Sequence, residues 1–161
     1  MNILKKVISS IICTGIILAG FAGCGGEKKT TDIDLLTLSS KLQSELTFKD
    51  TLNQLDNDMI ATYYPKVDVA KLNESVVFIS GTGSTAEEIA LFEVKNTADA
   101  ETVKNAVQER ITDQTISFED YNANEMVKIN NAVVKTSGNY VFLVMCDDYD
   151  SAGKILSEQI K

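Results

Sequence analysis

Hydrophobic residues first recur at helical spacing in the segment that follows residue 31. Four leucines lie three or four positions apart behind Asp32 and Asp34, namely Leu35, Leu38, Leu42 and Leu46. This spacing places them on one face of a helix, and an aspartate just before the first leucine is a typical N-cap. The pattern therefore predicts an amphipathic helix that begins near Asp34.

The next segment, residues 48–65, keeps a looser helical spacing. Its apolar positions are Phe48, Leu52, Leu55 and Met59. Asp50 and Asp56 are candidate caps, and Pro65 restricts the residue before it to extended conformations. We expect one or two short helices here, ended at Tyr63-Tyr64-Pro65.

From residue 75 the pattern changes to short runs of β-branched and aromatic residues. Residues 75–80 and 89–94 are two such runs, joined by Gly81-Thr82-Gly83-Ser84, and they predict a hairpin in which both glycines adopt positive φ. Helical spacing then returns from near Asp99, which predicts a helix with one face on the sheet. Its apolar-face positions are Val103, Ala106, Val107, Arg110 and Ile111.

The order strand, strand, helix then repeats. Residues 126–135 and 140–146 predict a second hairpin around residues 136–139, and a final helix carries Ala152, Ile155, Leu156 and Ile160. Residues 140–146 are apolar at every position, which is typical of a strand covered on both sides. The sequence thus predicts one α+β domain over residues 32–161. We expect an antiparallel sheet of about four strands with helices mostly on one face, in the order α-(α)-β-β-α-β-β-α.

The first 23 residues have the organisation of a signal peptide. Lys5 and Lys6 precede an apolar stretch over residues 7–21, which is shorter than the roughly 20 residues that a transmembrane helix needs. The stretch ends in the small residues Ala22 and Gly23. These features favour cleavage over retention in the membrane.

Cys24 follows these small residues directly, and the string Phe21-Ala22-Gly23-Cys24-Gly25-Gly26 resembles the lipobox of bacterial lipoproteins. The resemblance implies cleavage between Gly23 and Cys24 and a diacylglyceryl group on the Cys24 sulfur. The chain would then be held at the extracytoplasmic face of the cell membrane, since two or more acyl chains anchor a protein stably. The alternatives are an ordinary secretory signal, in which Cys24 is incidental, and an uncleaved anchor.

Residues 24–31 would form the lipidated cysteine and its tether. The seven residues after Cys24 lack apolar periodicity and would reach roughly 15 Å as a flexible coil. Cleavage removes Lys5 and Lys6 but no acid, so the net charge of −8 becomes −10. Anionic headgroups would repel such a domain, which favours a domain that projects from its anchor.

Composition excludes several kinds of chemistry. The chain has no histidine, and Arg110 is its only arginine. A triad with a histidine base and an HExxH zinc site are therefore impossible. With 23 acids against 15 bases, the chain also lacks the basic surface of a nucleic-acid binder. We expect no cofactor.

Two motifs match catalytic patterns by accident. Ser151-Ala-Gly-Lys154 fits S-x-x-K and Lys135-Thr-Ser-Gly138 resembles K-T-G, but their order is reversed relative to penicillin-recognising enzymes. Cys146 has no histidine to activate it and is followed by Asp147 and Asp148, so we expect a buried, unreactive thiol.

Three further groups leave alternatives open. Asp147, Asp148 and Asp150 could gather Ca²⁺, although Asp148 or Asp150 capping the last helix is the simpler interpretation. Glu87 and Glu88 would serve glycoside hydrolysis only if their carboxylates faced each other. Four tyrosines at the ends of predicted elements are candidate contact residues for a partner or ligand: Tyr63, Tyr64, Tyr121 and Tyr149.

Several strings along the domain resemble the uncharacterised lipoprotein family of domain of unknown function 4358. They are Phe48-Lys-Asp50, Ala86-Glu-Glu-Ile-Ala-Leu-Phe92, Asn131-Ala-Val-Val134 and Gly138-Asn-Tyr-Val141. The resemblance implies fold and location and assigns no site residues. We therefore expect a non-enzymatic, lipid-anchored domain that binds an envelope protein or a small ligand. The alternatives are an accessory envelope enzyme or enzyme inhibitor that uses carboxylate, lysine or tyrosine groups, and a structural lipoprotein.

Overall fold

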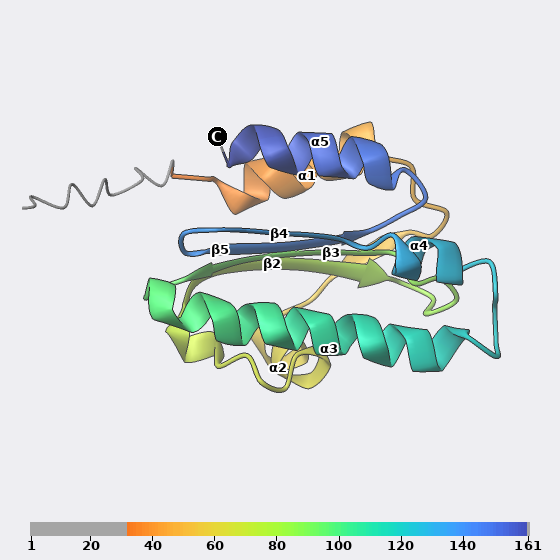
Figure 1. The fold of residues 1–161 in the computed structure, drawn as a ribbon, viewed down its shortest axis with the longest axis horizontal. Helices are drawn as coiled ribbons and strands as arrows, with labels where there is room; N and C mark the ends of the chain where they lie inside the picture. Colours follow the sequence, from red (N-terminus) through yellow and green to blue (C-terminus); the bar gives the residue numbers. More distant parts are fainter. Residues whose placement is uncertain (1–31, 161) are drawn as a thin grey trace, which may run out of the picture.

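A computed structural model describes residues 32–160 as a five-stranded antiparallel sheet between two layers of helices (Figure 1). The strands lie in the order β1-β2-β3-β5-β4. Their bounds are β1 Leu52–Gln54, β2 Leu72–Ser80, β3 Glu88–Val94, β4 Val133–Ser137 and β5 Tyr140–Met145. The α+β class is therefore confirmed, with one strand more than the sequence predicted.

Helices cover both faces of the sheet rather than mostly one (Figure 1). Helices α1 and α5 lie on one face, and α2 and α3 lie on the other. The reason lies in β3 and β5, which are buried almost throughout and have apolar side chains on both faces. The helix bounds are α1 Leu35–Glu45, α2 Asn57–Tyr63, α3 Ala100–Phe118, α4 Met126–Asn130 and α5 Tyr149–Gln159.

Two hydrophobic cores fill the spaces between the layers. Leu35, Leu38 and Leu42 of α1 pack with Ile155 and Leu156 of α5 over one face. The opposite face carries the second core, which α2 and α3 cover with Ile60, Tyr64, Val103, Ala106 and Val107. Among residues 32–160, no helix is long and apolar enough to cross a membrane.

The predicted N-caps of the first helices are confirmed in two positions. The carboxylate of Asp34 accepts a hydrogen bond from Thr37 N, 2.9 Å away, and that of Asp56 accepts one from Met59 N at the same distance. Asp50 caps no helix, because it lies in a bend that leads into β1. Asp148 stands at the N-cap position of α5, yet its side chain makes no capping hydrogen bond.

One predicted strand and one predicted turn differ from the structure. Residues 126–130 form the helix α4 instead of the start of a strand, and β4 begins only at Val133. In the first hairpin only Gly83 has positive φ, at 71°. Gly81 is needed for another reason, since a Cβ there would lie 2.7 Å from the carbonyl oxygen of Thr51.

Candidate functional site

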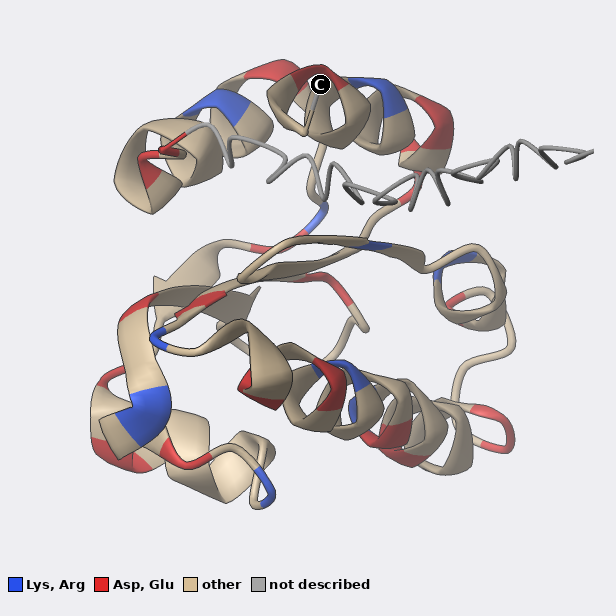
Figure 2. Cartoon of the chain, turned by 60° about the vertical axis from the view of Figure 1, so that its left-hand side comes forward, with Lys and Arg blue, Asp and Glu red and all other residues tan. Residues whose placement is uncertain are grey.

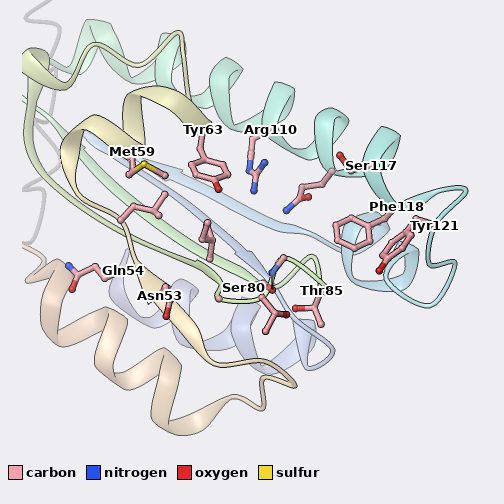
Figure 3. Close-up of a pocket in the computed structure, with 16 residues that line it drawn as sticks. Asn53, Gln54, Met59, Tyr63, Ser80, Thr85, Arg110, Ser117, Phe118 and Tyr121 are labelled. Carbon is pink, nitrogen blue, oxygen red and sulfur yellow. Dashed lines mark hydrogen bonds between the residues drawn. The ribbon is translucent and has the colours of Figure 1, made fainter.

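A pocket of about 650 Å³ opens between α3 and the β1 side of the sheet (Figure 3). One wall is the second half of α3 and the turn after it, from Arg110 to Tyr121. The opposite wall is β1 with the loop that joins β2 to β3, and Met59 and Tyr63 of α2 close one end. The short β1 and α2 leave this part of the sheet face less covered than the rest, which is why a pocket remains.

Arg110 is the charged residue of the pocket wall, and it is held by a buried carboxylate. Its Nε and Nη2 atoms each lie 2.9 Å from Oε2 of Glu88, whose side chain is fully buried at the start of β3. The hydroxyl of Tyr64 donates to Oε1 of the same carboxylate. Gln114 contributes a longer hydrogen bond of 3.5 Å from Nε2 to Oε2. Glu88 thus fixes three side chains, two from α3 and one from the residue directly after α2.

The pKa shifts in this cluster keep its charges in place. Burial alone would lower the pKa of Arg110, but the charge of Glu88 and the hydrogen bonds to it outweigh burial and raise the pKa. Burial and the neighbouring Glu88 carboxylate raise the pKa of Tyr64 well above its usual value. The guanidinium therefore stays protonated and the tyrosine stays a neutral donor at physiological pH.

Aromatic rings line the rest of this wall. The guanidinium carbon of Arg110 lies 4.9 Å from the centre of the Tyr63 ring, a cation–π arrangement that holds both side chains. Phe118 at the end of α3 and Tyr121 in the turn after it follow, with their ring centres 6.2 Å apart and their planes inclined at 57°. Tyr121 is 73% exposed at the rim, whereas Phe118 is buried. An open ring therefore stands beside the mouth of the pocket.

Several polar groups of the lining have hydrogen-bonding capacity that no other described residue uses. The Asn53 amide and the hydroxyls of Tyr63 and Tyr121 form no hydrogen bond within residues 32–160. The described residues contain no buried side-chain nitrogen or oxygen that lacks a partner, so these groups are not sealed off from solvent. By contrast, Ser80 and Thr82 both donate to Asp50, at 2.5 and 2.6 Å. The unused groups are those that a ligand could bind.

A second buried network lies around Lys128 of α4, outside the pocket lining. Its Nζ atom is 2.8 Å from Oε2 of Glu125 and 3.1 Å from Oε1 of Glu87. Glu125 also accepts a hydrogen bond from Ala86 N, and Glu87 accepts from the backbone of Lys49 and Asp50. This network joins α4 to the start of β3. It explains why residues 126–130 form a helix instead of the predicted strand.

The structure separates Glu87 from Glu88. Glu87 belongs to the Lys128 network, and Glu88 belongs to the Arg110 cluster on the pocket side. Each carboxylate is paired with its own cation and both are buried. They contact different residues, so their arrangement is that of two ion pairs rather than of an acid and a base facing one substrate.

The predicted burial of Cys146 is confirmed at the end of β5. Burial raises the pKa of its thiol to about 11, and the charges of Asp148 and Asp147 act in the same direction. Asp147 pairs with Lys49, 2.8 Å away. Within residues 32–160 no three or more histidine, cysteine or acidic side chains are placed to hold a metal ion.

The other sequence candidates are dispersed. Of the four tyrosines, Tyr63 and Tyr121 line the pocket, Tyr64 is buried beneath it, and Tyr149 begins α5 on the opposite side of the sheet. Ser151 and Lys154 lie in the first turns of α5. Cys24, the cleavage position at Gly23 and the tether lie outside the described residues.

Sequence reasoning missed Arg110 as a member of the site. The available signal for Arg110 was its position on the apolar face of α3. A single arginine among apolar positions of a helix requires a buried partner, yet Glu88 lies 22 residues earlier. Nothing in the local pattern identifies which acid it would contact.

Comparison with known proteins gives one match. A family described as a domain of unknown function, DUF4358, matches residues 44–146, which span β1 to β5 and every residue of the pocket lining. No curated protein and no solved structure matches the chain.

Proposed function

The chain belongs to the DUF4358 family, and from that premise we propose that it is a lipid-anchored module on the extracytoplasmic face of the cell membrane, which binds a ligand in the pocket beside α3. The anchoring half rests on the sequence before residue 32. The binding half rests on the pocket. The two halves are tested separately.

The sequence around Cys24 supports the anchor. A positively charged start, an apolar stretch too short to span a bilayer and a cysteine directly after Ala22-Gly23 occur together. A tether of seven residues then leads to the folded domain. Such a tether holds the domain within roughly 15 Å of the membrane, so its pocket would meet molecules at the cell surface.

One observation carries the binding role: the described residues give the pocket unused hydrogen-bonding groups but no activated nucleophile. Its carboxylate, Glu88, lies beneath the wall and is already paired with Arg110. The thiol of Cys146 is buried elsewhere, with a pKa of about 11. Binding requires only the arrangement of amide, hydroxyl and aromatic groups that is present.

Replacing Cys24 with serine tests the anchor in the cells that make the protein. We expect wild-type chain in the membrane fraction and the Cys24→Ser variant in the soluble or secreted fraction, because the acyl chains attach to the sulfur. Cys13→Ser is the matched control, since that residue lies in the segment that is removed. Equal membrane retention of both variants would overturn the anchor.

Site-specific photo-crosslinking tests the binding role. A photoreactive phenylalanine in place of Tyr121 stands at the pocket rim, and the same residue in place of Tyr149 stands on the other side of the sheet. Irradiation of intact cells should give a defined adduct from position 121 and none from position 149. Absence of an adduct at 121, or the same adducts from both positions, would contradict a ligand in this pocket.

A further inference from the structure

We infer that the pocket takes an uncharged carbohydrate, a short oligosaccharide or the end of a longer one. This inference rests on the proposed binding role and adds the chemical class of the ligand. Four features of the pocket carry it: its charge, its unused polar groups, its exposed ring and its size.

Charge favours a neutral ligand. Among residues 32–160, Arg110 is the only charged residue that lines the pocket, and Glu88 balances its charge from below. Acidic residues are distributed over both helical layers of the molecule, with lysines among them (Figure 2). The acidic surface as a whole disfavours an anion, while the guanidinium edge inside the pocket disfavours a cation. A ligand without charge meets neither penalty.

The unused polar groups match hydroxyl groups. A sugar hydroxyl donates one hydrogen bond and accepts others, so it is best met by groups that can do both. The Asn53 amide and the hydroxyls of Tyr63 and Tyr121 have this double capacity, and they lie on three separate elements around the opening. The remaining N–H groups of Arg110 add donors at the inner wall, held in place by Glu88 and Tyr63.

The exposed ring of Tyr121 supplies an apolar surface for one face of a sugar. Pyranose rings present C–H groups on their faces and hydroxyls at their edges, so they pack flat against an aromatic ring. Tyr121 is 73% exposed and is supported from behind by Phe118. A ring that remains in water beside a polar pocket is suited to this contact.

Size and the neighbouring sheet edge favour a carbohydrate over a peptide. The volume of about 650 Å³ lies within the range of roughly 300–1,000 Å³ that is usual for ligand pockets, and it has room for a disaccharide. A peptide that extends a sheet takes its affinity from main-chain hydrogen bonds along the edge strand. The edge strand here, β1, has only three residues, Leu52–Gln54.

A glycan array tests the inference with the full-length protein in detergent. The probes are neutral oligosaccharides of two to four sugars, with uronic-acid and sulfated oligosaccharides and a set of random heptapeptides beside them. We expect binding to members of the neutral set. The Tyr121→Ala variant should bind them about tenfold more weakly, because it loses the stacking surface, whereas Tyr149→Ala should bind as wild type does.

Three results would overturn the inference: no binding to any neutral oligosaccharide, binding only to charged glycans or peptides, or equal binding by the two tyrosine variants. Circular dichroism of both variants should show that the fold is retained, since both substitutions are made outside the buried cores. If position 121 gives an adduct in cells but the array shows no binding to neutral glycans, only the inference of a carbohydrate ligand is refuted. Failure of the adduct itself would refute the proposed binding role.

Discussion

Arg110 and Glu88 show how one buried pair shapes the site. Two N–H groups of the guanidinium meet one carboxylate oxygen at 2.9 Å, and Tyr64 occupies the other oxygen. A buried ion pair adds little net stability compared with apolar residues of the same size, but removing one partner leaves an uncompensated charge. The pair is therefore best understood as a device that fixes the inner wall of the pocket.

Substitution of Arg110 measures this dependence. We expect Arg110→Gln to lower the free energy of unfolding by about 3–5 kcal/mol, because Glu88 is left buried without a cation. Arg110→Lys keeps the positive charge and should cost clearly less. Urea unfolding followed by circular dichroism provides both values. Equal losses for the two variants, or a loss below about 1 kcal/mol for Arg110→Gln, would show that the pair does not hold the wall.

Asp50 connects the loop before β1 with the β2–β3 loop, and this makes stability depend on pH. Hydrogen bonds from Ser80 and Thr82 lower the pKa of Asp50 to about 2. In the unfolded chain the pKa is about 3.9. The ionised carboxylate therefore contributes stability above about pH 4, and this contribution is lost as the pH falls from about 4 towards 2.

The Asp50→Asn variant should lack that part of the pH dependence. Compared between pH 6 and pH 3, wild type should lose more unfolding free energy than Asp50→Asn. In this range the Asp50 carboxylate takes up a proton in the unfolded wild-type chain but stays mostly ionised in the folded protein. Asp120→Asn is the control, since Asp120 is exposed and its side chain makes no hydrogen bond within the described residues. Parallel pH profiles for wild type and Asp50→Asn would refute the assignment.

At the scale of elements, the segments with strong periodicity were predictable. The first hairpin, the long helix α3 and the strand β5 each follow from local patterns of apolar residues. The strand β1 and the helix α4 were not, because segments of three and five residues are too short to show a period. Their structure is decided by distant partners, β2 for β1 and the Glu87–Glu125–Lys128 network for α4.

Gly81 of the first hairpin and Gly153 of α5 differ in what an added methyl group would contact. We expect Gly81→Ala to cost about 1–3 kcal/mol, because its Cβ would lie 2.7 Å from the backbone oxygen of Thr51 and force β1 away from β2. Gly153→Ala is the matched control within α5. Its Cβ would meet nothing closer than 4.0 Å, and the variant should gain up to about 1 kcal/mol from helix propensity.

Thermal and urea unfolding distinguish these outcomes. A Gly81→Ala variant as stable as wild type would mean that the close approach of Thr51 and residue 81 does not persist in solution. Because this contact brings β1 to the rim of the pocket, the same variant should also weaken any binding there.

At the scale of the whole molecule, the class of fold was predictable and the site was not. A strand that is apolar on both faces already implied cover on both sides, and the structure provides it with two helical layers. The pocket arises from residues between positions 53 and 121 that meet only after the sheet has formed. Tyr63 and Tyr121 were recognised as contact candidates. Arg110 was marked only by its place on an apolar helix face, and Gln114 and Asn53 gave no local signal.

The pocket can serve the cell surface only if the chain is held there. The most direct measurement is mass spectrometry of the N-terminal peptide from protein isolated with the membranes of the cells that make it. We predict a peptide that begins at Cys24 and carries the mass of a diacylglyceryl group on that residue. A peptide that begins at Met1, or a Cys24 without any acyl modification, would contradict the lipid anchor.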